Sequence, residues 1–208
     1  KLKKVFLKIQ TKFSPNYSLK YYNNNELFTN NLFDYSKLKT FPFSERNSLL
    51  KNRIKIFSNQ SSDFSLHKKQ YYKKGDRKFY YFQKDYLKTI CIYMRKYYKK
   101  NFSFPNWYYD CFKNANYPGV KKVFYDQGFD IKIPWEISRF QHLNKLCNFA
   151  KINKLDKDYD FVKAQVMNFI YIIPPGTGIH WFNAMEVAIR GSNMAMITDI
   201  LISENKLH

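Results

Sequence analysis

Apolar and basic positions alternate in short stretches of the first half of the chain. The alternation is clear over residues 2–12 and over residues 51–57, and the aromatic residues 78–82 are a third strand candidate. Successive side chains of a strand point to opposite faces, so each stretch predicts a half-buried β-strand. Residues 27–38 carry a weaker pattern that is typical of a helix. The first half is therefore expected to mix strands and helices.

The strand expected at residues 51–57 has one basic face. Ile54 and Ile56 lie on one side of it, and Arg53 and Lys55 lie on the other. Residues 40–44 (TFPFS) precede it and predict an extended piece stiffened by proline. Together they predict a stiff loop that leads into a strand with cations on its outer side.

Helices are expected on both sides of the third strand. Residues 61–63 (SSD) offer an N-cap for a short helix to about residue 72, and Gly75 then turns the chain. Residues 84–100 have apolar side chains at steps of three and four, which predicts an amphipathic helix packed on a core. The apolar face consists of Leu87, Ile90, Cys91, Met94, Tyr97 and Tyr98.

The pattern changes near residue 101, where prolines and glycines punctuate an aromatic stretch, and we place a domain boundary there, between residues 1–100 and 101–208. Beyond it, residues 135–150 predict a helix and residues 160–173 a strand or buried extended segment. A sharp turn is expected at residues 174–178 (PPGTG). The final helix is expected at residues 182–202, with Gly191 as its weak point.

The charge of the chain points to a polyanionic partner. Its 208 residues contain 36 Lys and Arg against 16 Asp and Glu, a formal net charge of +20. Nucleic acid is the commonest such partner, because lysines and arginines on phosphates release condensed counterions. A membrane surface competes, but the most apolar stretch, residues 169–175, is much shorter than the roughly 18 residues of a membrane span. We therefore expect a soluble or peripheral protein.

Aromatic residues make up 20% of the chain, and Asn, Lys and Ile are also abundant. This bias is typical of an AT-rich coding sequence, such as that of an organelle. A surface rich in Tyr, Phe and Lys is also suited to stacking on unpaired bases and contacting phosphates. The start of the chain is basic, but its alternation over residues 2–12 favours folded protein over a removed transit signal.

Catalytic and metal-binding motifs are not recognisable in the sequence. Cys91, Cys111 and Cys147 are widely spaced, which favours free thiols, although a metal-ligand set assembled in three dimensions from Cys111, Cys147, His142 and another group stays open. The glycine turn at residues 176–178 is followed by Ile-His-Trp rather than Lys-Ser/Thr, so a plain turn is favoured over a phosphate loop. No cofactor and no enzymatic activity are predicted.

The alternating acids Asp156, Asp158 and Asp160 resemble the start of a calcium-binding loop. The glycine and the closing glutamate of such a loop are absent, so these residues predict a solvated acidic loop.

The order of elements over residues 41–94 resembles small-subunit ribosomal protein S-ten. In that family a proline-containing loop tip leads into a strand that ends in serine, then a basic helix, a strand and a further helix. The corresponding stretches are residues 41–43, 53–58, 67–71 (HKKQY), 77–82 and 88–94. Residues 73–76 (KKGD) depart from the family's Arg-Thr-His. The last hundred residues match nothing in the family core, which implies a lineage-specific extension.

The resemblance implies an α/β (α+β) fold, a ferredoxin-like sandwich with a long basic loop at residues 39–53, followed by a mixed α/β C-terminal extension. The protein would be a constituent of the head of the mitochondrial small ribosomal subunit. Its partners would be ribosomal RNA and other small-subunit proteins, with no membrane and no small-molecule substrate. The basic loop, strand and helix predict RNA-binding residues Lys39, Phe41, Pro42, Arg46, Lys51, Arg53, Lys55, Lys68, Lys69, Lys73, Lys74, Arg77 and Lys78.

Two alternatives stay open. The first is an accessory subunit of a mitochondrial membrane complex of the respiratory chain, where basic and aromatic extensions also occur. The second is an RNA-processing enzyme, which would need carboxylates that converge on one cleft.

Overall fold

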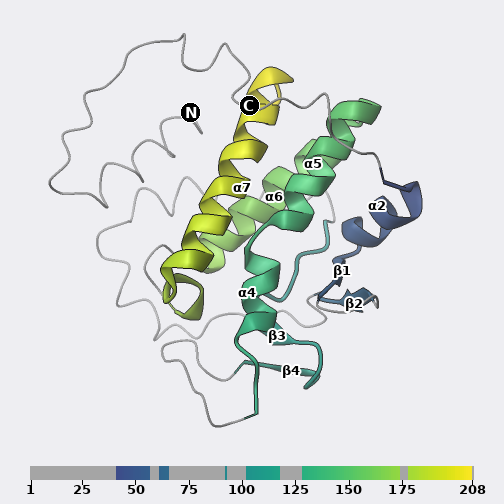
Figure 1. Cartoon of the computed structure of the whole chain (residues 1–208). Coiled ribbons are helices and arrows are strands. Elements are labelled where there is room, and N and C mark those ends of the chain that lie inside the picture. Colours follow the sequence, from purple (N-terminus) through teal and green to yellow (C-terminus); the bar gives the residue numbers. More distant parts are fainter. Residues whose placement is uncertain are drawn as a thin grey trace, which may run out of the picture.

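The computed structural model describes residues 41–56, 61–65, 92, 102–117, 128–173 and 178–207 (Figure 1). These residues form helices and two small antiparallel sheets, a mixed α+β fold. In chain order the elements are α2 (Phe43–Leu50), β1 (Arg53–Lys55), β2 (Ser61–Asp63), β3 (Tyr109–Asp110), β4 (Ala115–Asn116), α4 (Lys132–Ser138), α5 (Gln141–Asn153), α6 (Asp156–Ile172), the 3-10 helix η3 (Ile179–Trp181) and α7 (Ala184–Ser203).

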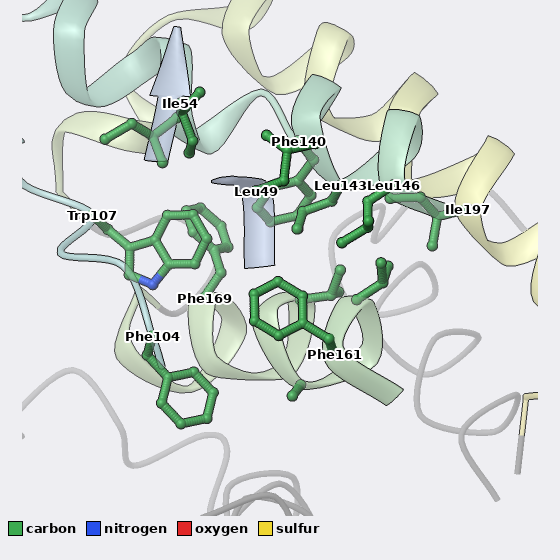
Figure 2. Close-up of a cluster of buried hydrophobic side chains, with 14 of the residues drawn as sticks. Leu49, Ile54, Phe104, Trp107, Phe140, Leu143, Leu146, Phe161, Phe169 and Ile197 are labelled. Atoms are coloured by element: carbon green, nitrogen blue, oxygen red, sulfur yellow. The ribbon is translucent and has the colours of Figure 1, made fainter. Parts of the chain in front are cut away.

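Three helices form the centre of the molecule. Figure 1 shows α5, α6 and α7 side by side, and α5 packs against both of the others. Aromatic rings fill the space at one end of this bundle, where the Trp107 ring lies 5.2 Å from Phe169 and 5.9 Å from Phe140 between ring centroids (Figure 2). The indole nitrogen of Trp107 donates a hydrogen bond of 2.8 Å to the Asn168 side chain. The buried polar end of the tryptophan is thereby satisfied.

A buried arginine lies inside the bundle. The Arg190 guanidinium is held between the rings of Phe169 and Trp181, at 4.8 and 4.7 Å from their centroids. It donates hydrogen bonds to the carbonyl oxygens of His180 and Ser138. Burial lowers the pKa of Arg190 to about 10, so the group keeps its charge at neutral pH. Stacking and backbone acceptors thus replace the lost hydration of this cation.

The N-terminal described segment packs on the side of α5. Its helix α2 contacts α5, and the rings of Phe41 and Phe43 lie 4.6 and 5.0 Å from the ring of Phe149. Strand β1 follows and pairs antiparallel with β2, with Ile54 opposite Ser62. This segment therefore reaches the bundle through aromatic contacts.

The basic-faced strand is confirmed, although it is shorter than expected. Ile54 and Ile56 are buried in the core, whereas Arg53 and Lys55 are exposed. Two isoleucines on one side anchor the strand, so its cations are held at the surface.

Residues from both sides of the predicted boundary at residue 101 contribute to one hydrophobic core. Phe64 accepts a backbone hydrogen bond of 2.7 Å from Asn106, and the side chain of Asn52 donates to Ser103. Ile54, Phe104 and Phe161 belong to the same buried cluster (Figure 2). The boundary itself stays a prediction.

Two local predictions in this segment are wrong. The stretch at residues 40–44 is extended only to Pro42, which has ψ of 148° and is the N-cap of α2, so much of the predicted loop is helical. Proline is compatible with a helix start, because the first N–H groups have no partner within the helix. Residues 61–63 do not cap a helix. They pair with β1 instead, because the ladder satisfies their backbone groups.

The largest error concerns residues 160–173, which form most of helix α6 rather than a strand. This helix buries residues on nearly all sides, Phe161, Val162 and Met167 among them, so it has no clear apolar stripe. Asp156 and Asp158 are not in a solvated loop. They lie in its first turn, where negative charge is favourable, and Asp158 is fully buried.

The later helices agree better with expectation. The helix predicted at residues 182–202 is α7, and Asn183 caps it by accepting a 2.9 Å hydrogen bond from the Met185 amide. The helix predicted at residues 135–150 is present as two helices, α4 and α5. They are separated at Phe140, whose φ of 64° is left-handed.

Other predicted elements lie outside the described residues. They are the strands at residues 2–12 and 78–82, the helix at residues 27–38, residues 66–72 of the short helix expected after residue 63, and most of the turn at residues 174–178. The helix at residues 84–100 is described only at Ile92, which is helical, off the predicted apolar face and 68% exposed. The ferredoxin-like arrangement of these elements therefore stays a prediction.

Candidate nucleic-acid interface

The cations of β1 lie at an exposed edge of the described structure. Lys51 follows the end of α2, and Asn52, with φ of 53°, turns the chain into the strand. Among the described residues, Arg53 has one acidic neighbour, Asp63, at 3.7 Å, and both side chains are well exposed. Such a pair is worth little in water, so Arg53 remains available to a phosphate. Lys51, Arg53 and Lys55 therefore form an exposed group, which we call the β1 cations.

A groove lies beside the β1 cations, between α2, β1, α4 and α5. Its volume is about 540 Å³, and both polar and apolar side chains line it. Arg53 and Lys55 reach it from β1, and Lys145 reaches it from α5. Glu45 and Glu136 contribute carboxylates from α2 and α4. We call this hollow the α2–α5 groove.

The Lys145 ammonium is the most engaged cation of the groove. It lies 2.5 Å from a carboxylate oxygen of Glu45 and 4.7 Å from the centroid of the Phe41 ring. Both members of the ion pair are partly exposed, so this pair is weak and can exchange partners.

Glu136 and His142 have shifted protonation equilibria. Burial raises the pKa of Glu136, although the neighbouring Arg139 opposes this, and the two side chains form an ion pair. Burial lowers the pKa of His142 to about 3, so its imidazole is neutral at pH 7. A neutral imidazole offers one hydrogen-bond donor and one acceptor. The groove thus presents cations at its rim and a neutral polar ring at its wall.

The predicted RNA-binding residues are only partly brought together. Pro42, Arg53 and Lys55 line the groove, and Lys51 is exposed nearby. Phe41 is half-buried against Phe149, beneath the Lys145 ammonium. The remaining predicted residues lie outside the described part of the chain: Lys39, Lys68, Lys69, Lys73, Lys74, Arg77 and Lys78.

Arg46 has a structural partner. Its guanidinium donates two hydrogen bonds of 2.6 Å to the carboxylate of Asp158, whose side chain is 1% exposed. A bidentate pair of this kind fixes α2 against the start of α6. We therefore assign Arg46 to the fold and leave it out of the RNA contacts proposed below.

The sequence reasoning missed Gln141 and Lys145, and it considered His142 only as a possible metal ligand. They belong to α5, about ninety residues beyond the β1 cations, and the packing of α2 on α5 brings the two sets together. The spacing of apolar residues in α5 predicted a helix, but it did not indicate which other segment of the chain packs against that helix. Only the tertiary structure identifies them.

The positive charge is concentrated in one part of the chain. Residues 1–127 contain 27 Lys and Arg against 8 Asp and Glu, whereas residues 128–208 contain 9 against 8. Helices α4 to α7 therefore form a nearly neutral unit. The electrostatic attraction for a polyanion comes almost entirely from the first part of the chain.

The described residues contain no group of three or more His, Cys, Asp or Glu side chains that could hold a metal ion. Cys111 and Cys147 are free thiols, and burial raises the pKa of Cys147 to about 12. Within the same residues, no helix is both long and apolar enough to cross a membrane.

Comparisons with protein-family models, with curated proteins and with solved structures each returned no match for this chain.

Proposed function

We propose that this protein is a structural constituent of the mitochondrial small ribosomal subunit that binds ribosomal RNA. The observation that carries the proposal is the concentration of positive charge in residues 1–127, together with the exposed β1 cations beside a groove. The resemblance of residues 41–94 to the S-ten family is the reason for proposing the small ribosomal subunit as the assembly and a ferredoxin-like sandwich as the fold. No reaction is part of the proposed role.

The β1 cations suit contact with an RNA backbone. Lys51, Arg53 and Lys55 are spaced by two residues along an extended piece of chain, and Ile54 and Ile56 anchor that piece in the core. Each cation placed on a phosphate releases counterions, a gain that does not depend on base sequence. A rigid anchor lowers the entropy that is lost when these side chains bind.

The outer face of α7 suits contact with protein. The charged residues of this helix, Glu186, Arg190 and Asp199, are all buried. Its exposed positions are uncharged, and they are Ala184, Met185, Ala188, Gly191, Ser192, Ala195 and Ser203. Without cations this face attracts no phosphate, and its small side chains allow close approach of another protein surface. We assign it to neighbouring ribosomal proteins.

Sedimentation of an organelle lysate through a sucrose gradient tests the proposal. Half of the lysate is treated with ribonuclease, and the protein is followed by mass spectrometry. We expect migration with the small ribosomal subunit that is lost after ribonuclease treatment. A position in the gradient that ribonuclease treatment does not change would overturn the proposal.

The uncharged face of α7 also supports one alternative, an accessory subunit of a mitochondrial membrane complex. This alternative predicts migration with that complex after mild detergent extraction, unchanged by ribonuclease. A variant in which Arg53→Glu and Lys55→Glu are combined separates the two roles. If the protein binds ribosomal RNA, this variant should be lost from the ribosomal fraction. If the protein is instead bound to a membrane complex through α7, the variant should still migrate with that complex.

A further inference from the structure

Helix α5 begins at the α2–α5 groove without a side-chain cap. Gln141 and His142, its first residues, both line the groove. The N-cap residue is Phe140, whose side chain accepts no hydrogen bond from the helix, and no acidic residue lies in the first turn. The N–H groups and the positive dipole end of this helix of 13 residues are thus left for an external anion.

His142 gives a second and independent indication of a ligand. Its side chain lines the groove although the residue is only 9% exposed. Among the described residues, none forms a hydrogen bond or an ion pair with its ring. The ring nitrogens are not among the fully buried polar atoms that lack a partner in the described residues, so they remain accessible to a group in the groove. A hydrogen-bonding group bound in the groove would supply that partner.

We propose that the α2–α5 groove binds one unpaired nucleotide of RNA. The phosphate would lie at the start of α5, between Lys145 and the side chains of Arg53 and Lys55. The base would contact His142 and Gln141. This inference rests on the proposed function and adds to it the kind of RNA that is bound. Bases of a duplex are stacked and paired, whereas an unpaired base can be splayed into a pocket.

The size and composition of the groove agree with this occupant. Its volume of about 540 Å³ lies within the range of roughly 300–1,000 Å³ for pockets that enclose small ligands. Burial keeps His142 neutral, with a pKa of about 3, so the ring can hydrogen-bond a base edge. The cations at the rim then face the phosphate.

Glu45 would compete with the phosphate for the Lys145 ammonium. Its carboxylate forms the 2.5 Å ion pair with Lys145, and Glu136 is the other carboxylate in the lining. A phosphate must displace Glu45 from Lys145 and also approaches its negative charge. Replacing Glu45 with glutamine removes both penalties, so E45Q should bind RNA more tightly. A purely structural role of Glu45 would predict no gain.

The test uses the full chain and a short fluorescent single-stranded RNA, with binding followed by anisotropy. We expect K145A and H142F each to weaken binding by about tenfold, since each removes a hydrogen bond to a charged or buried partner. E45Q should tighten binding severalfold. The matched control is K157A, which removes an exposed lysine outside the groove and should change binding by less than about twofold.

The outcomes separate this inference from the proposed function. In one outcome, K145A and K157A weaken RNA binding equally, and H142F and E45Q leave it unchanged. This outcome would refute nucleotide binding in the groove, although the protein would still bind RNA. If the wild-type chain binds no RNA, the proposed function fails, and adenosine monophosphate is then titrated alone. Saturable binding lost in K145A would support a site for free nucleotides, and no binding would overturn the site as well. Q141A, at an exposed position, replaces H142F if that variant does not fold.

Discussion

Replacing Arg46 with methionine should destabilise the fold strongly, although Arg46 lies near the surface. Methionine keeps much of the length and apolar stem of arginine but removes both hydrogen bonds to Asp158. The Asp158 carboxylate, whose side chain is 1% exposed, would then be buried without a countercharge. This cost, rather than the loss of attraction itself, dominates the effect.

The magnitude follows from the surroundings of Asp158. Breaking a buried pair by removing one partner costs about 3–5 kcal/mol. Asp158 lies in the first turn of α6, where the helix dipole offsets about 1 kcal/mol of that cost. We therefore expect a loss of about 3 kcal/mol in the free energy of unfolding. For a chain of this size, that corresponds to a fall in Tm of about 6–12 °C.

Thermal unfolding followed by tryptophan fluorescence provides the assay, because Trp107 and Trp135 are buried in the folded protein. R53M is the matched control, since its Asp63 partner is 3.7 Å away and exposed, and its Tm should change by less than about 2 °C. Combining R46M with D158L should recover most of the stability. A Tm of R46M within 2 °C of the wild type would refute the reasoning.

Other predictions concern acid stability and helix α7. The folded-state pKa values of His142 (about 3) and His180 lie below the unfolded value of about 6.5, so below pH 6.5 the unfolded chain binds more protons and stability falls. Between pH 7 and pH 5 the loss from His142 should be about 2 kcal/mol in urea titrations, and His180 should add to it in the same direction; a flat profile would contradict the burial. N183A removes the cap of α7 and should cost about 1 kcal/mol in the same titrations, whereas N183D should not. G191A should gain about 0.5–1 kcal/mol, because nothing lies within 4 Å of the added Cβ; a loss would show a hidden neighbour.

Sequence periodicity predicted the elements that have two distinct faces. Strand β1 was found because its isoleucines and cations alternate. Helix α6 was missed because Val162, Gln165 and Asn168 are all buried, so no polar face marks its period. Its start was marked instead by acids at Asp156 and Asp158, which stabilise a first turn, and this signal was assigned to a loop.

The start of α2 was missed for a related reason. Pro42 was taken to stiffen an extended segment, and its own backbone is indeed extended. A proline is equally compatible with the position before a helix, and the following Ser44 and Glu45 are typical of a first turn. Local sequence favoured neither reading, and the contact of Phe43 with Phe149 stabilises the helical one.

The candidate site could be predicted only where it is local. The β1 cations were identified from the alternation of their own strand. His142 and Lys145 could not be identified, because their role depends on the packing of α2 and β1 against α5, a contact without a sequence signature. Arg46 is the opposite case. Its charge led to a predicted RNA contact, whereas in the structure its guanidinium forms an ion pair with Asp158.

The pair between Arg46 and Asp158 also sets an order of events during synthesis, because its members lie 112 residues apart. At about 5–20 residues per second, the ribosome needs roughly 5–20 s to make Asp158 after Arg46. Until then this pair cannot fix α2, and the strongly basic residues made early in this interval precede the helices that complete the core. The nascent chain therefore exposes its cations to RNA before it can bury its core.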